Sequence, residues 1–356
     1  MSPRLATSVG DFALLNPIIC GSGEPVLTES GIRAALSAGA AGVIAKSVNE
    51  RPEAAAQLDR ADYTRADSQG RAVAWDRPGS SLFCRSGLQQ RAVEDWFAAI
   101  ARIDREVAAE QRFVAASLVL GSHEGAVQIA TIACKAGLRV FELNIGAPHA
   151  SEAKPGAIVL ETEPARVQAL VAAVRLATEG MQLWVKLTGL STNLPALAVA
   201  AKQGGADAVV MMGRFMGMIP DIDTFAPVLG TSGAYSGPWA LPIVCRFLAL
   251  SRRAVGKDFA LLGTNGVRDG ADVARMGLAG ASAVEALSAV MLEGFSALTR
   301  ICDELGALLE ARDVTFAELI GRAADRLEGY GEQPVNPGRW QDFVPVATRR
   351  ELANVP

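Results

Sequence analysis

Two lysines stand at the ends of apolar runs that have the composition of buried strands. Lys46 ends the run AAGVIAK, and Lys186 lies within LWVKLTG. An ammonium group among apolar residues needs an anionic or carbonyl partner, because burial otherwise forces it to become neutral. An internal salt bridge with a carboxylate is the alternative for each lysine. If both strand ends face the same cavity, two lysines directed into it favour a bound ligand.

A glycine-containing turn and a helix start follow the last two apolar runs. The turn is Gly263-Thr264-Asn265-Gly266, and Ser288 stands just before a helical pattern. Glycine lets the backbone approach a ligand closely, and free N–H groups at a helix N-terminus bind phosphate. A turn of this kind is also an ordinary connection, but its position here predicts a phosphate site.

Asn144 ends another apolar run, directly before a bend that contains Gly146 and Pro148. Its amide group offers donors and an acceptor to a polar heterocycle. A turn-capping role is the alternative.

A barrel is the scaffold that would bring these residues together. Helix ends that contain glycine are repeatedly followed by runs that are apolar on both faces, which is typical of parallel strands covered by helices. Eight alternating units in about 300 residues predict an α/β fold of the (β/α)8 TIM barrel type. The strands are expected at about residues 17–21, 42–46, 113–119, 139–145, 182–187, 207–212, 259–263 and 282–287.

Helical patterns fill the intervals between these strands, and two intervals are unusually long. Residues 47–88 and 213–237 are expected to form active-site loops at the C-terminal face of the barrel. We expect the barrel domain to span residues 1–315 and residues 316–356 to form a C-terminal tail packed on it. The helices are expected at about 28–38, 89–110, 123–136, 163–179, 193–204, 238–255, 269–279 and 290–311.

Composition excludes several classes of protein. The 356 residues carry a net charge of −4 that is spread along the chain, so we expect no nucleic-acid partner. The five cysteines are scattered without a CxxC pair, and only two histidines occur, so no metal site is expected. No apolar run is long enough to span a membrane and no secretion signal is recognisable, which predicts a cytoplasmic protein. The chemistry is therefore expected to depend on a bound cofactor and a small-molecule substrate.

Seven motifs occur in the order and spacing of one family. They are NPIICGSG, AGAAGVIAKS, ELNIGAPH, VKLTG, SGAYSGPWALP, LLGTNGV and Ser288, and they cover most of residues 10–305. The chain resembles the dihydroorotate dehydrogenase-like family, and its motifs look most like those of the FMN domain of dihydropyrimidine dehydrogenase. The resemblance implies an FMN-binding TIM barrel that oxidises or reduces a carbon–carbon bond next to a carbonyl. It also suggests a homodimer, because homodimers are common in the family.

Matching positions imply the roles of individual residues. Lys46 and Lys186 would face the N1/O2 edge of the flavin, where a positive charge stabilises the reduced flavin anion. The other residues implied in cofactor binding are Ser22, Asn144, Gly233, Gly263, Thr264, Asn265, Gly266 and Ser288.

The sequence departs from the family at the substrate side. The family carries Cys or Ser as the acid/base in the loop after the fourth strand, and this position is Ala147. Cys84, with Arg85 beside it, stands where pyrimidine-handling relatives have Asn, and Gly213-Arg214 replaces an Asn-Thr pair. FMN binding is therefore expected, whereas these departures count against oxidation of a pyrimidine. The electron donor or acceptor is unknown.

Two arginines and an asparagine are the predicted substrate contacts. A guanidinium at a dry barrel mouth is unfavourable unless it meets an anion, and its fork suits a carboxylate. Arg85 and Arg214, together with Asn144, therefore predict a small unsaturated or cyclic carboxylic acid, or its reduced form. Surface exposure is the alternative for both arginines.

The missing acid/base leaves three candidates on loops expected near the mouth. Cys84 is the first choice, because the segment 47–88 would bring it over the flavin and a neighbouring lysine or Arg85 would lower the pKa of its thiol. His149 and Ser191 are the others, and His149 has a structural hydrogen bond as its alternative role. A reaction that needs no side-chain base is also left open.

The expected function is that of an FMN-dependent dehydrogenase or reductase acting on CH–CH groups, with Lys46, Cys84 and His149 as catalytic residues. One alternative is a flavin barrel with lyase or isomerase chemistry, or a non-catalytic flavin binder, because of Ala147. Another is an aldolase or synthase without flavin, in which Lys186 forms a Schiff base.

Overall fold

The computed structural model describes residues 2–77, 80–147 and 158–352. The chain divides into two compact units, Met1–Asp325 and Arg326–Pro356. The described part of the second unit contains two short 3-10 turns, Tyr330–Glu332 and Arg339–Phe343, and helix α12, Val346–Leu352.

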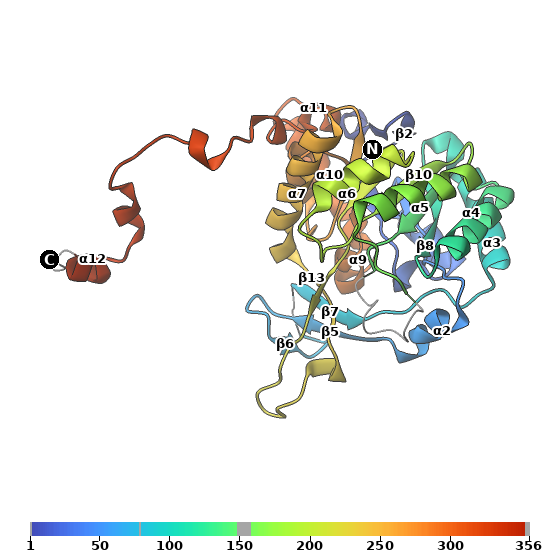
Figure 1. Cartoon of the computed structure of the whole chain (residues 1–356), viewed down its shortest axis with the longest axis horizontal. Coiled ribbons are helices and arrows are strands. Elements are labelled where there is room, and N and C mark those ends of the chain that lie inside the picture. Colours follow the sequence, from blue (N-terminus) through green and yellow to red (C-terminus); the bar gives the residue numbers. More distant parts are fainter. Residues whose placement is uncertain (1, 78–79, 148–157, 353–356) are drawn as a thin grey trace. The chain divides into compact units, whose positions relative to one another are not determined.

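The first unit is a closed barrel of eight parallel strands, which confirms the predicted TIM barrel (Figure 1). Every strand lies within two residues of its predicted position. Around the barrel the order is β3 (Ile18–Cys20), β4 (Gly42–Ile44), β8 (Phe113–Val119), β9 (Val140–Asn144), β10 (Gln182–Lys186), β11 (Ala208–Met211), β14 (Ala260–Thr264) and β15 (Ala281–Ala286).

Helices cover the outside of the barrel close to the predicted positions. One prediction was wrong: the helix expected at 290–311 is divided at Gly294, whose φ of +83° lies in the left-handed region that favours glycine. The covering helices are α1 (Glu29–Ser37), α3 (Val93–Val107), α4 (His123–Ala136), α5 (Pro164–Ala177), α6 (Leu194–Gln203), α7 (Leu241–Val255), α8 (Gly270–Leu278), α9 (Ser288–Glu293) and α10 (Ser296–Glu310).

The interior of the barrel changes from apolar to polar along its strands. Alternate residues of a strand face the same side, so Val140 and Glu142 share one face of β9, and Trp184 and Lys186 share one face of β10. Val140 and Trp184 belong to a buried apolar cluster inside the barrel, and the N-terminal hairpin of β1 (Thr7–Val9) and β2 (Phe12–Leu14) contributes Val9 and Leu14 to it. The polar residues follow at the C-terminal strand ends, where TIM barrels have their active sites.

The two long intervals form a second, five-stranded sheet rather than irregular loops. Its order is β12 (Phe215–Gly217), β13 (Gly233–Ser236), β7 (Ser81–Arg85), β5 (Asp62–Ala66) and β6 (Ala72–Val73), and β13 pairs with β7. We call this the rim sheet. The rim sheet lies at one end of the barrel, below the barrel in Figure 1. The pairing of β13 with β7 joins two segments that are far apart in the sequence.

The first unit extends beyond the boundary expected at residue 315. Helix α11 (Phe316–Leu319) packs on α8, and Phe316 is fully buried. Packing of the remaining tail on the barrel stays a prediction. In the described part of the chain, no helix is long and apolar enough to cross a bilayer.

Candidate functional site

A cavity opens at the C-terminal ends of the barrel strands, between them and the rim sheet. Its empty volume is about 980 Å³ including the open mouth. Nine of the predicted site residues line it: Ser22, Lys46, Asn144, Lys186, Arg214, Thr264, Asn265, Gly266 and Ser288.

The predicted phosphate loops meet at one end of this cavity. Asn265 has a φ of +74° and is 8% exposed, and neither polar atom of its amide has a hydrogen-bond partner among the described residues. The Ser288 and Ser236 hydroxyl oxygens lie 2.8 Å apart. Because buried polar groups are normally satisfied, the unpaired amide indicates that a polar ligand group belongs here.

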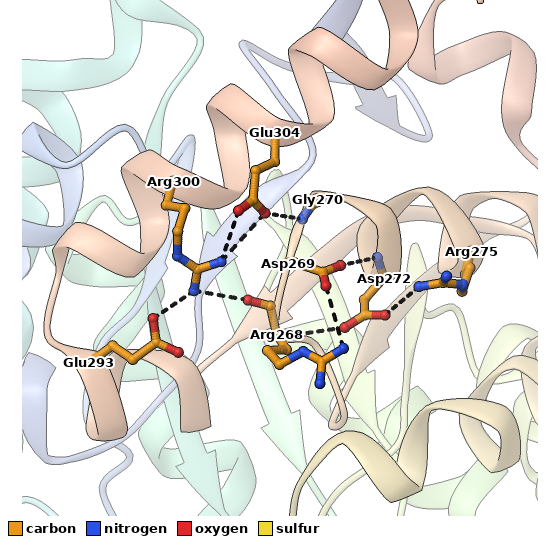
Figure 2. Close-up of polar contacts among 8 residues, drawn as sticks. All are labelled: Arg268, Asp269, Gly270, Asp272, Arg275, Glu293, Arg300 and Glu304. Carbon is orange, nitrogen blue, oxygen red and sulfur yellow. Dashed lines mark hydrogen bonds and ion pairs between the residues drawn. The ribbon is translucent and has the colours of Figure 1, made fainter. Parts of the chain in front are cut away.

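An ion-pair network holds the two phosphate loops from outside (Figure 2). Arg300 of α10 contacts Glu293 at 2.6 Å and Glu304 at 3.2 Å, and it also donates to the backbone carbonyl of Arg268. The Glu304 carboxylate accepts a hydrogen bond from the backbone N–H of Gly270. The end of α9 and the loop after β14 are thereby tied to the same helix.

Lys46 is paired with one carboxylate. Its Nζ lies 2.8 Å from Glu24 Oε1, and its side chain is 5% exposed. Burial lowers the pKa of Lys46, although the charge and hydrogen bond of Glu24 oppose this effect. For Glu24, burial acts to raise the pKa, but the charge and hydrogen bond of Lys46 outweigh it and lower the pKa to about 2. The Glu24 carboxylate is therefore ionised at neutral pH.

Lys186 is paired with two carboxylates. Its Nζ lies 2.7 Å from Glu142 Oε2 and 2.6 Å from Glu285 Oε2, and both acids are almost completely buried. Burial alone would lower the pKa of Lys186, but the two carboxylates raise it. A Schiff-base lysine must instead be readily deprotonated, so this environment does not fit the aldolase alternative.

A chain of hydroxyl groups connects the cavity with the cluster of Lys186, Glu142 and Glu285. Ser22 and Ser47 lie 3.0 Å apart, and Ser47 and Ser117 lie 2.8 Å apart, measured between hydroxyl oxygens. Ser117 donates to Glu142 Oε1 at 2.9 Å. Glu142 thus accepts a hydrogen bond at Oε1 and forms an ion pair with Lys186 at Oε2.

The cavity fits FMN. The hydroxyls and the unpaired Asn265 amide suit a phosphate or sugar, and the lysine-bearing strand ends offer charged groups to a ring system. The residues that would hold the cofactor are Ser22, Lys46, Asn144, Lys186, Thr264, Asn265, Gly266 and Ser288, all of which line the cavity.

Arg214 lies in the cavity wall with neutral partners. Its guanidinium donates to Cys84 Sγ at 3.0 Å and to Ser86 Oγ at 2.7 Å. No carboxylate of the described residues lies within ion-pair distance of it. Among the described residues, the direct partners of the Arg214 side chain are therefore neutral.

Cys84 and Arg85 do not lie where the sequence suggested. Cys84 is fully buried behind Arg214 and is not part of the cavity wall, and burial raises the pKa of its thiol even though Arg214 opposes this. The expected lowering of its pKa by Arg85 was therefore wrong. Arg85 points outward instead, toward Asp62 at 3.3 Å and the carbonyl of Leu229.

An apolar patch forms another part of the cavity wall. Ala147 is 6% exposed and clusters with Leu88, Val119 and Ile158, which also line the cavity. Asn144 lies nearby in sequence, and its Oδ1 accepts from the backbone N–H of Gly146 at 3.0 Å, as a turn cap would. Asn144 thus combines both roles considered for it: it caps the turn and lines the cavity.

Three other predicted residues are not among those lining the cavity. A side chain at Gly233 would collide with the Cys84 carbonyl at 2.8 Å, and one at Gly263 would collide with Met276 Sδ at 2.5 Å, so both glycines serve close packing. Ser191 accepts from the backbone N–H of Asn193 outside the cavity. His149 lies outside the described residues. Cofactor contacts at Gly233 and Gly263 stay predictions.

Several residues that line the cavity or pair with its lysines were missed. They include carboxylates whose signal was available: Glu142 and Glu285 are single charges inside otherwise apolar strands, a pattern that requires a buried partner. Glu24 and the hydroxyl groups gave no comparable signal. The residues missed are Glu24, Ser47, Gln57, Ser86, Glu142, Ser236 and Glu285.

Comparisons with known proteins match this architecture. The sequence model of the dihydroorotate dehydrogenase family matches residues 4–309. The catalytic subunit of dihydroorotate dehydrogenase B (NAD(+)) from Methanocella arvoryzae is 28% identical over 322 residues, which are 90% of this chain and 98% of that protein. A putative dihydroorotate dehydrogenase A (fumarate) from Solibacter usitatus is 29% identical over 334 residues, 90% of this chain and 99% of that protein. Dihydroorotate dehydrogenase A (fumarate) from Limosilactobacillus reuteri is 34% identical over 158 residues, 44% of this chain and 50% of that protein.

Proposed function

Since the chain belongs to the dihydroorotate dehydrogenase family, and is therefore an FMN-dependent oxidoreductase acting on CH–CH groups, we propose that its substrate is a small unsaturated or cyclic carboxylic acid or the reduced form of one. The observation that carries this proposal is Arg214, a cation in the cavity wall whose direct partners are neutral. A carboxylate is the anion whose geometry matches the guanidinium fork.

The cavity wall suits the rest of such a molecule. FMN supplies hydride transfer at the carbon–carbon bond. Arg214 would hold the carboxylate, and the apolar patch of Leu88, Val119, Ala147 and Ile158 would cover the carbon skeleton and exclude water from it. Asn144 would orient a carbonyl next to the reacting bond. These contacts define an acid with one charged end and an apolar edge.

Proton transfer cannot use position 147, because Ala147 has no ionisable group. Among the described hydroxyls of the cavity, Ser86 is the one in contact with Arg214, at 2.7 Å, and a guanidinium stabilises an oxygen that becomes negative. We therefore infer that Ser86 relays the proton: its own hydroxyl proton passes to water at the open mouth of the cavity, Arg214 stabilises the oxygen as it becomes negative, and this oxygen accepts the proton from the substrate. Ser86→Ala should slow reduction of bound flavin by substrate at least 100-fold, as expected for loss of a general base. A decrease below tenfold would show that the proton leaves to solvent.

Two further properties of the chain can be tested: the acceptor of its electrons and its oligomeric state. The relatives' names give NAD(+) for the B type and fumarate for the A type, so either acceptor is a candidate here. We expect a homodimer, which sedimentation of the purified protein tests. Reoxidation of the reduced protein by fumarate, compared with NAD(+), tests the acceptor.

Matched compounds test carboxylate recognition most directly. Dihydroorotate and dihydrouracil share a ring but only the first has a carboxylate, and succinate and succinamide form a second pair without a ring. Under anaerobic conditions, we expect the acid of at least one pair to bleach the flavin absorbance at least tenfold more efficiently than its uncharged partner. Equal efficiency of the two members would contradict the proposal.

A further inference from the structure

The buried cluster of Glu142, Lys186 and Glu285 has more negative than positive groups. Two carboxylates lie within 2.7 Å of one ammonium group, and all three side chains are at least nine-tenths buried. With both acids ionised, the cluster would carry one uncompensated negative charge. Two carboxylates that share a buried site do not both ionise readily, and an uncompensated buried charge is unfavourable.

The contacts indicate which acid carries the additional proton. Glu142 accepts from Ser117 at Oε1 and contacts Lys186 at Oε2, so its charged form is stabilised at both oxygens. Glu285 contacts Lys186 through Oε2 only, and its Oε1 is buried without a hydrogen-bond partner among the described residues. The protonated form therefore suits Glu285 better than Glu142.

Glu285 also borders the cofactor cavity, which Glu142 does not. We propose that Glu285 is a protonated carboxylic acid beside the bound FMN, and that its proton sets the charge of the cluster and thereby the midpoint potential of the cofactor. Reduction adds negative charge to the flavin, so loss of this proton would place a like charge next to it and lower the potential. This inference concerns the cofactor alone and is independent of the substrate.

The surroundings of Glu285 support its protonated state. Burial, followed by the charge of Glu142, raises its pKa to about 8, although Lys186 opposes this. On the neighbouring strand β3, burial and then the charge of Glu285 raise the pKa of Cys20 to about 12, so that thiol stays neutral. Thr264 of β14, opposite Glu285 in the strand register, does not titrate. Among the described residues, Lys186 is therefore the cation in direct contact with Glu285.

The test is the midpoint potential of FMN bound to the full chain, measured at pH 6.5 and pH 9.5 by equilibration with reference dyes. Glu285→Gln should match the wild type at pH 6.5, because both side chains are neutral. At pH 9.5 its potential should be higher than that of the wild type by about 30 mV, a tenfold change for a two-electron couple. An equal difference at both pH values, or none at either, would overturn the proposal.

A further variant makes the test specific. Glu142→Gln leaves Lys186 and Glu285 as a one-to-one pair, so it too should remove the additional alkaline drop in potential, and it serves if Glu285→Gln does not fold.

The free energy of unfolding provides a test of the Glu285 protonation state that does not depend on bound cofactor. An acid whose pKa is raised in the folded state stabilises the fold fully below its unfolded pKa, and this contribution is lost as pH rises through the folded pKa. Relative to Glu285→Gln, the wild type should therefore lose stability between about pH 4.3 and pH 8. Parallel stability profiles of the two proteins would contradict a protonated Glu285.

Discussion

Lys46 and Lys186 lie at the ends of two strands of the same barrel, yet one has a single carboxylate partner and the other has two. Burial prevails at Lys46 and lowers its pKa, whereas the paired acids prevail at Lys186 and raise it. Arg214 completes the series, because its direct partners are neutral. Three cations of one cavity thus differ in the charge they present to a ligand, and this charge depends on partners rather than on residue type.

The largest expected loss of stability follows from removing Lys186, the cation with two carboxylate partners. Lys186→Met leaves Glu142 and Glu285 buried together, and we expect a loss of about 3–5 kcal/mol in the free energy of unfolding at pH 8. Lys46→Met is the matched control and should cost about 1–3 kcal/mol, because Glu24 is partly exposed. Urea titrations measure both. Equal losses in the two variants would abolish the distinction between the lysines.

An intermediate effect is expected at the cation without a carboxylate partner. Arg214→Lys keeps the charge but loses the bidentate geometry, so the KM for the acid substrate should rise about tenfold, or ~1.4 kcal/mol. Arg85→Lys is the control, since Arg85 contacts Asp62 and Leu229 outside the cavity. Steady-state kinetics should show its KM within about twofold of the wild type. An unchanged KM in Arg214→Lys would count against carboxylate recognition.

The smallest effect, on the free energy of unfolding, is expected at Arg300. It tests whether burial, rather than the number of carboxylate partners, makes Lys186 important for stability. Arg300 also contacts two carboxylates, Glu293 and Glu304, but its side chain is 37% exposed (Figure 2). Exposed ion pairs contribute little, so Arg300→Met should lower the free energy of unfolding by about 1 kcal/mol or less. A loss as large as that of Lys186→Met would show that partner number is what matters.

The barrel could be predicted because each strand is a local pattern. A run such as FVAASLVLG is apolar on both faces, and β8 follows it from Phe113 to Val119. The rim sheet could not be predicted, because β7 pairs with β13, about 150 residues later, and neither strand is long or continuously apolar. Pairings at this separation leave no signal in a local pattern.

The charge of the site was the other part that the sequence did not determine. Lys186 was identified as a site residue, but its partner Glu285 lies 99 residues away. Cys84 was placed at the mouth and expected to be acidic, although Arg214, which lies 130 residues away, covers it and burial raises the pKa of its thiol. Which wall a loop residue faces is decided by tertiary packing, so residue type and spacing were not sufficient.

Binding of FMN in this cavity as a reversible electron carrier is tested most directly by the absorbance spectrum of the purified protein before and after anaerobic reduction. The mass of the cofactor released on denaturation completes the test. We expect a yellow protein that bleaches reversibly and releases one FMN per chain. A colourless protein that does not take up added FMN would contradict the account.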